Sequence, residues 1–335
     1  MAAELPKEEE LLQKLFHINN DRAFEQVCIE VFEFQYSQNI LYRSFCDLQK
    51  KSPRWVNSPT DIPFLPISFF KSHKVSTTGF NPDKYFESSG TTGSINSRHY
   101  VKDLSVYEQS FLNHFQHVYG DPKDYIILAL LPSYLQRNNS SLIYMVRKLM
   151  DISGHLQNGF YLDEFESLYH ALLKLENDKQ KVLLIGVTYA LLDFAEKYPV
   201  KLQHTIVMET GGMKGRRDEL IRQDVHQQLQ VAFGLDSIHS EYGMTELLSQ
   251  AYAENKGIFK SPPWMKILIR EEDDPQSVIY KKALSGAINI IDLANIFSCS
   301  FIATDDRGRL YADGSFEVLG RLDNSDIRGC SLLSL

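Results

Sequence analysis

The residues with the clearest potential for chemistry form a short loop with the sequence SSGTTG. They are Ser88, Ser89, Gly90, Thr91, Thr92 and Gly93. The two glycines let the backbone turn tightly and approach a ligand, while the hydroxyls and successive backbone N–H groups can form an anion-binding nest. No Gly-Lys-Ser/Thr follows, so this is not a Walker loop, and its spacing does not match a dinucleotide fingerprint. Taken alone, a hexamer of this composition is more typical of a flexible surface turn.

Three further motifs make phosphate chemistry the better interpretation. They are SEYGMTE from Ser240, TDDRGRLY from Thr304 and GRLDNSDIRG from Gly320. Their order and spacing resemble the motifs of the adenylate-forming superfamily, which includes acyl-CoA synthetases and luciferase-like ligases. The intervening sequences IPFLPISFFKSHKV, LPSYLQRNNSSLIYM and PPWMKI look like the acyl-protein synthetase (LuxE-like) family, whose members supply activated fatty acid to the reductase of bacterial luminescence. The resemblance runs from about Phe32 to Cys330.

The resemblance assigns the SEYGMTE motif to the nucleotide and its metal ion. It implies that Tyr242 lays its ring against adenine, that Gly243 leaves room for the base, and that Thr245 hydrogen-bonds the α-phosphate. Glu246 is then the Mg²⁺ ligand, because Mg²⁺ prefers one or two carboxylates together with phosphate oxygens. Without this context, Glu246 would be interpreted as a solvated surface carboxylate and Tyr242 as a buried aromatic residue at a strand end.

Two later residues and an earlier pair of glycines complete the expected ATP site. By resemblance, the Asp306 carboxylate holds both ribose hydroxyls, and Arg321 is its companion at the ribose and phosphate. Gly211 and Gly212, in the sequence ETGGMKG, are expected to line the adenine site. A plain strand-to-helix turn explains this glycine pair nearly as well.

The implied reaction joins a carboxylate to the α-phosphate of ATP and gives an acyl adenylate and pyrophosphate. Two anions must be brought together, so positioning and charge screening supply most of the rate. The lysine common in relatives just after the loop is replaced by Ile95, and Arg98 and Lys102 are the nearest cations for pyrophosphate. Lys71 and Lys74 could also attract phosphate, although a solvated loop is the default interpretation.

The C-terminal region bears on the acyl acceptor. Only 12 residues follow Asp323, so we expect the chain to lack the mobile domain, its lysine and the coenzyme A tunnel of larger relatives. By resemblance, Cys330 takes the acyl group as a thioester before it passes to a reductase, and a thiolate is a strong nucleophile. Two alternatives stay open. The acceptor could be coenzyme A or a carrier protein, or the chain could be a non-catalytic nucleotide- or acyl-binding subunit of a reductase complex.

The surrounding sequence predicts an α/β fold that positions these motifs. Buried runs such as YIILALL from Tyr125 and KVLLIGV from Lys181 alternate with amphipathic helices, which is typical of a parallel sheet with ligands at the carboxyl ends of its strands. We expect a helical region over residues 1–60 packed on the main domain, an α/β core over 61–272, and a β-rich subdomain and tail over 273–335. The predicted fold is the adenylate-forming large-domain fold, with parallel sheets flanked by helices, a smaller antiparallel β subdomain and no small C-terminal domain.

Composition and charge exclude several other classes of protein. The chain has 335 residues and a net charge of −8, and no basic stripe suits a nucleic-acid partner. The acidic N-terminus lacks the basic flank of a signal peptide, and no run reaches the roughly 18 apolar residues of a membrane span. The four cysteines lack metal-ligand spacing and are expected to be reduced. We therefore expect a cytoplasmic enzyme that uses ATP and Mg²⁺, a fatty or other carboxylic acid as substrate, and an acyl reductase or acyltransferase subunit as a candidate partner.

Overall fold

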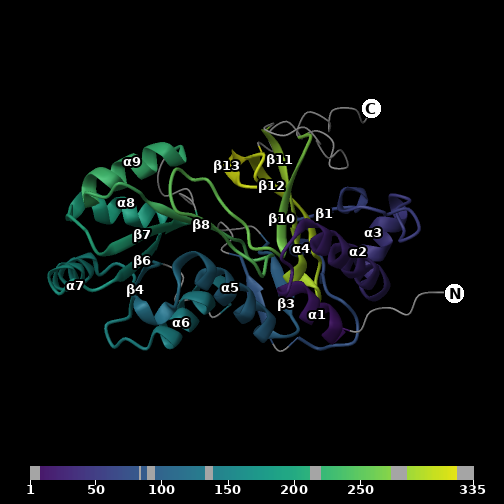
Figure 1. Cartoon of the computed structure of the whole chain (residues 1–335), viewed down its shortest axis with the longest axis horizontal. Coiled ribbons are helices and arrows are strands. Elements are labelled where there is room, and N and C mark those ends of the chain that lie inside the picture. Colours follow the sequence, from purple (N-terminus) through teal and green to yellow (C-terminus); the bar gives the residue numbers. More distant parts are fainter. Residues whose placement is uncertain are drawn as a thin grey trace.

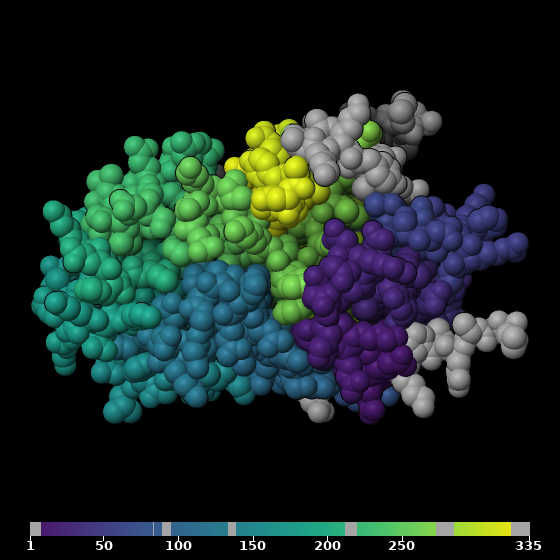
Figure 2. Space-filling view, viewed as in Figure 1, coloured from purple at the N-terminus to yellow at the C-terminus, as the bar shows by residue number. Residues whose placement is uncertain are grey.

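The computed structural model describes residues 8–82, 84–88, 95–132, 139–211, 220–272 and 285–322. Within these residues, two larger sheets and one β-hairpin form the framework (Figure 1). The N-terminal helices lie beside one sheet, and helices from the middle of the chain cover the other. Figure 2 shows the two groups at opposite ends of the molecule, in purple and blue at the right and in teal and green at the left.

The first sheet has six strands in the order β5-β4-β6-β7-β8-β9 and is parallel except at β9. Its strands β4 and β6 are buried along their whole length, which confirms the prediction from the uninterrupted apolar runs. The strands are β4 (Ile126–Leu130), β5 (Gly159–Tyr161), β6 (Val182–Val187), β7 (Thr205–Thr210), β8 (His239–Tyr242) and β9 (Ala251–Ala253).

Five helices accompany this sheet. Figure 1 shows α6 on one side of it and α8 and α9 on the other, as right-handed crossovers between parallel strands require. Helix α5 ends at Gly120, whose φ of 85° lies where glycine is favoured. The helices are α5 (Leu104–Tyr119), α6 (Ser141–Ser153), α7 (Phe165–Asn177), α8 (Thr188–Lys197) and α9 (Arg222–Phe233).

The second sheet has the order β1-β12-β11-β10, with β13 paired to the free part of β12. It is antiparallel except where β1 runs parallel to β12. Its strands are β1 (Leu65–Pro66), β10 (Met265–Arg270), β11 (Ser285–Asp292), β12 (Phe301–Leu310) and β13 (Phe316–Arg321). The domain boundaries after residues 60 and 272 stay a prediction; β1 and β10, which precede residue 273, pair with strands that follow it.

The N-terminal helices are α1 (Glu8–Phe16), α2 (Asp21–Gln38) and α3 (Ile40–Leu48). The Asn20 side chain caps α2, as the polar sequence before it predicts, and Asn39 caps α3 by accepting from the Tyr42 amide. Gln35 of α2 is buried and donates to the carbonyls of Asn295 and Ile296, just before β12. These bonds fix α2 against the second sheet.

A hairpin of β2 (Lys84–Glu87) and β3 (Arg98–Val101) carries the SSGTTG loop at its turn. Helix α4 (Phe69–Ser72) follows β1 and contacts β3. Three short 3₁₀ segments complete the description: η1 (Pro59–Asp61), η2 (Pro122–Asp124) and η3 (Leu293–Asn295). Among the described residues, no helix combines the length and apolar character needed to cross a membrane.

Candidate active site

A cleft of about 2110 Å³ lies between the two sheets, where β6, β7 and β8 end. Ligands of open parallel sheets collect at this edge because the loops that follow the strands emerge there. Of the residues predicted for the ATP site, eight line this cleft. They are Ser88, Gly211, Tyr242, Gly243, Thr245, Glu246, Asp306 and Arg321.

One end of the cleft is lined by Ser88, Ser97 and Glu246. The Ser88 amide donates to the Ser97 carbonyl over 3.0 Å, and the Ser97 amide donates to the Ser88 hydroxyl over 2.9 Å. The Ser97 side chain hydrogen-bonds the Glu246 carboxylate. Burial raises the pKa of Glu246, whereas the Ser97 hydrogen bond and the charges of Lys71 and Arg321 lower it. The remaining residues of the loop, from Ser89 to Gly93, lie outside the described part of the chain.

The backbone of the Thr245–Glu246 segment is fixed from three directions. Nδ1 of His99, on β3, lies 2.9 Å from the Thr245 carbonyl oxygen, and the Asn295 side-chain amide donates to the Glu246 carbonyl over 2.7 Å. Asp292 accepts from the amides that follow, at Leu248 and Ser249. Burial lowers the pKa of His99 to about 4, so the ring is neutral at pH 7 and donates from Nδ1 to the carbonyl. The predicted phosphate and metal ligands therefore sit on a rigid segment.

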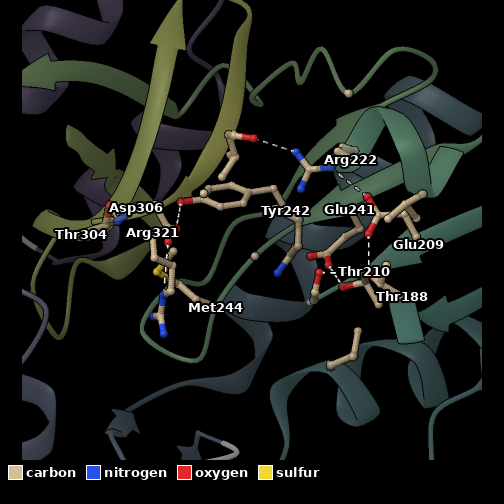
Figure 3. Close-up of a pocket in the computed structure, with 18 of the residues that line it drawn as sticks. Thr188, Glu209, Thr210, Arg222, Glu241, Tyr242, Met244, Thr304, Asp306 and Arg321 are labelled. Atoms are coloured by element: carbon tan, nitrogen blue, oxygen red, sulfur yellow. Dashed lines mark hydrogen bonds and ion pairs between the residues drawn. The ribbon is translucent and has the colours of Figure 1, made fainter. Parts of the chain in front are cut away.

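Tyr242, Asp306 and Arg321 lie together in another part of the cleft, where a ribose is predicted to bind (Figure 3). The Tyr242 hydroxyl donates to Asp306 Oδ2 over 2.7 Å, and Arg321 Nε lies 3.7 Å from Asp306 Oδ1. Asp306 and Arg321 face each other directly across β12 and β13. Burial raises the pKa of Asp306, and the Tyr242 hydrogen bond and the Arg321 charge oppose this rise. The Tyr242 ring packs on Phe316 and Phe259.

A buried ion-pair network at the ends of β7 and α9 forms the opposite wall. Glu209 Oε1 lies 3.0 Å from Arg222 Nε and 3.6 Å from His226 Nε2, and the Thr188 hydroxyl donates to Glu209 Oε2 over 2.8 Å. Burial alone would raise the pKa of Glu209. The His226 hydrogen bond and the Arg222 charge outweigh this effect and lower the pKa to about 2. Glu209 is the first residue of ETGGMKG, but only the glycines of this motif stand out in the sequence. Gly211 lines the cleft with a φ of 72°, and Gly212 lies outside the described residues.

Glu241 is a second functional candidate that the sequence analysis missed, although it stands inside SEYGMTE. It is 7% exposed, lines the cleft and accepts a hydrogen bond from the Thr210 hydroxyl. Burial raises its pKa to about 7. A Cβ atom at Gly243 would lie only 2.5 Å from Glu241 Oε1, so any larger residue there would displace this carboxyl group. The predicted approach of adenine to Gly243 stays a prediction.

One predicted residue within the described part of the chain is not brought to the cleft. Arg98 does not line it; this residue is exposed, pairs with Glu87 at 3.0 Å and lies over the Tyr85 ring. Cys330 lies outside the described residues. Lys71, by contrast, lines the cleft.

The metal-binding capacity of the site rests on Glu246. No group of three or more His, Cys, Asp or Glu residues suited to a metal occurs in the described segments. A single buried carboxylate fits Mg²⁺, which takes its other ligands from phosphate oxygens and water. Glu246 would therefore hold the ion together with the nucleotide.

A sequence-family model described as acyl-protein synthetase, LuxE, matches residues 14–334. The chain belongs to this family. No curated protein matches the sequence of this LuxE-family chain.

Solved structures confirm the predicted fold class at low sequence identity. A 2-hydroxyisobutyryl-CoA ligase in complex with 2-HIB-AMP and CoA is 11% identical with a TM-score of 0.66, and the match covers 96% of this chain and 73% of that one. ATP-bound MatB from Rhodopseudomonas palustris is 15% identical with a TM-score of 0.55, and the match covers 73% of this chain. The LuxE-family chain spans only 50% of the length of that MatB chain. These likenesses establish the adenylate-forming large-domain fold.

Proposed function

We propose that this LuxE-family chain activates a carboxylic acid with ATP, forming acyl-AMP and pyrophosphate. The observation that supports this most is the convergence of separate segments on one cleft. The loop base at Ser88, the Thr245–Glu246 segment and the Asp306–Arg321 pair come from different parts of the sequence, yet all line it. Together, these residues support binding of a nucleoside triphosphate more strongly than any one motif does alone. The structure of MatB, which shares the fold, contains bound ATP.

In the proposed reaction, a carboxylate oxygen of the acid attacks the α-phosphorus of ATP. The new C–O–P linkage forms as the bond from the α-phosphorus to the bridging oxygen breaks, and pyrophosphate leaves with that electron pair. Asp306 accepts hydrogen bonds from the ribose hydroxyls, and Thr245 donates to the α-phosphate. The attacking carboxylate is already ionised, so no general base is needed. Mg²⁺, bound by Glu246 and phosphate oxygens, would screen the negative charge of the triphosphate.

Apolar residues in the same cleft support a fatty acid as the substrate. Pro132, Leu142 and Met145 line it near the start of α6, and so do the rings of Tyr107 and Tyr189. Burial of an alkyl chain against such side chains contributes about 0.8 kcal/mol for each methylene group. A long-chain carboxylate would therefore bind with its chain against α6 and its head towards the phosphates.

We propose Cys330 as the acceptor of the acyl group, as the family resemblance implies, and the chemistry of the other thiols supports this choice among the cysteines. The remaining cysteines, Cys28, Cys46 and Cys299, are buried with no exposed surface. Burial raises the pKa of each thiol, that of Cys46 to about 12, which suppresses the thiolate needed for attack. Cys330 attacks the acyl carbonyl as a thiolate, a thioester forms, and AMP leaves. An acyl reductase or acyltransferase subunit would then take the acyl group.

The activation step is tested by exchange of labelled pyrophosphate into ATP. In the unmodified chain, exchange should depend on an added fatty acid. Glu246→Gln should reduce exchange by at least about 100-fold, because the metal–triphosphate complex loses its protein ligand. Glu271→Gln, on an exposed residue outside the cleft, is the matched control and should leave exchange unchanged.

An unchanged rate of exchange in Glu246→Gln would contradict the assignment of this site. Nucleotide binding without exchange under any carboxylic acid would favour a non-catalytic subunit.

The acceptor is tested by covalent labelling with radioactive fatty acid and ATP. Cys330→Ser should retain pyrophosphate exchange but lose the label, since an alcohol at this position is a far weaker nucleophile than a thiolate. Cys28→Ala should keep the label, because that thiol is buried. Equal labelling of the Cys330→Ser variant would contradict self-acylation. Release of acyl-CoA when coenzyme A is added to that variant would identify coenzyme A as the acceptor.

A further inference from the structure

Helix α4 places one cation in the cleft, where its charge acts on Glu246. The helix begins directly after β1, which runs beside β12, the strand that carries Asp306. Its first two residues are anchored: Phe69 packs on Phe45, and the buried Phe70 packs edge-on against His99 of β3. The third residue, Lys71, then lines the cleft.

Four lysine and arginine residues in the described segments line this cleft. They differ in whether a carboxylate already neutralises the charge of the side chain. Arg222 pairs with the buried Glu209, and Arg321 pairs with Asp306. Lys256 stands next to Gly257, which packs on Arg222, and so belongs to the wall opposite Glu246. Within the described part of the chain, no hydrogen bond or ion pair holds Lys71. Its charge acts on Glu246, as does that of Arg321.

We propose that Lys71 contacts the β- and γ-phosphates of ATP and the pyrophosphate that leaves. This inference rests on the proposed function, and it names the residue that stabilises the negative charge of the leaving group. Lys71 lines the cleft together with Ser97 and Glu246, and its charge acts on the Glu246 carboxylate. As the bond to the α-phosphorus breaks, negative charge accumulates on the departing pyrophosphate oxygen. An ammonium group at this place stabilises that charge.

The two nearest cations predicted from the sequence, Arg98 and Lys102, are placed less well. Lys102 pairs with Glu8 and does not line the cleft. Ile95 stands where relatives have a loop lysine; it lines the cleft, but it carries no charge. Arg98 is exposed, and Glu87 already neutralises its charge. Lys71 lies on α4 and not in the loop. It would supply the positive charge that the loop lysine supplies in relatives.

The experiment compares binding of ATP, pyrophosphate and AMP to the full chain by calorimetry. Lys71→Met keeps most of the side-chain volume but removes the charge. It should weaken ATP and pyrophosphate binding by about 10- to 100-fold, the range for a lost charge-assisted hydrogen bond. AMP, which lacks the β- and γ-phosphates, should bind within about twofold of the unmodified chain. Lys71→Arg should restore most of the ATP affinity, because a cation is retained.

Lys74→Met is the matched control, since Lys74 lies three residues away over the Tyr100 ring and does not line the cleft. It should bind all three ligands normally. Equal weakening of ATP and AMP in Lys71→Met would show a general structural effect, and unchanged ATP binding would show no contact; either result overturns the assignment of Lys71 but leaves the proposed function standing. If the unmodified chain binds neither ATP nor pyrophosphate, the proposed function fails as well. Thermal melting of each variant establishes that it is folded.

Discussion

At the scale of single residues, the cleft contains two buried glutamates whose pKa values are shifted in opposite directions. Glu209 has cationic and hydroxyl partners that hold its pKa near 2, so it is ionised at all ordinary pH values. Glu241, one strand away, receives one hydrogen bond from Thr210, and burial together with the nearby Glu209 charge raises its pKa to about 7. The protein therefore keeps one carboxylate charged and holds a proton on the other over much of the physiological range.

Glu241 should give the folded protein a characteristic dependence of stability on pH. Its folded-state pKa lies above that of an unfolded glutamate, near 4.5, so the folded state binds the proton more tightly. The stabilisation from this proton is complete below pH 4.5 and is lost as the pH rises through about 7. Between pH 5 and pH 8, the unmodified chain should lose up to about 3 kcal/mol of unfolding free energy relative to Glu241→Gln. Denaturant unfolding at both pH values measures this.

The exposed Glu254 supplies the control for this measurement. Glu254→Gln should follow the unmodified chain at both pH values, since the residue is exposed and does not line the cleft. Parallel stability curves for the unmodified chain and Glu241→Gln would mean that Glu241 is ionised throughout this pH range.

At the scale of secondary-structure elements, the segment after β8 is held by residues distant in sequence. Asp292, at the end of β11, accepts four hydrogen bonds: from the amides of Leu248, Ser249 and Ala294 and from the Ser249 hydroxyl. Asn295 and His99 bind the carbonyls of Glu246 and Thr245. A loop without regular structure thus acquires the rigidity that a metal ligand requires.

Local patterns were sufficient for part of this arrangement. The apolar runs of β4 and β6 depend on neighbours in sequence, and the structure confirms them as buried strands. The motifs also indicated which residues to expect around the nucleotide. Local patterns could not show that β1 and β10 join the second sheet, because strand pairing depends on contacts between distant segments. For the same reason, Glu209 and Glu241 were missed: each looks ordinary until its buried partners are known.

At the scale of the whole molecule, Arg222 connects the two sheets across the cleft. Its Nε binds Glu209 on β7, and its Nη1 donates to the Val318 carbonyl on β13 over 3.2 Å (Figure 3). The guanidinium carbon also lies 4.9 Å from the centre of the Phe259 ring. One side chain therefore joins the wall of the first sheet to the strand that carries Arg321, and so helps to set the distance between the two walls of the proposed nucleotide site.

A double-mutant cycle separates the two roles of this arginine. Arg222→Met should destabilise the protein by about 3–5 kcal/mol, because the Glu209 carboxylate is left buried with its main cation removed. Adding Glu209→Gln removes that buried charge and should recover much of the stability in denaturant unfolding. The bond to Val318 is absent from both variants, so ATP affinity should stay reduced in the double variant even where stability returns. Recovery of both properties together would mean that the connection between the sheets has no part in nucleotide binding.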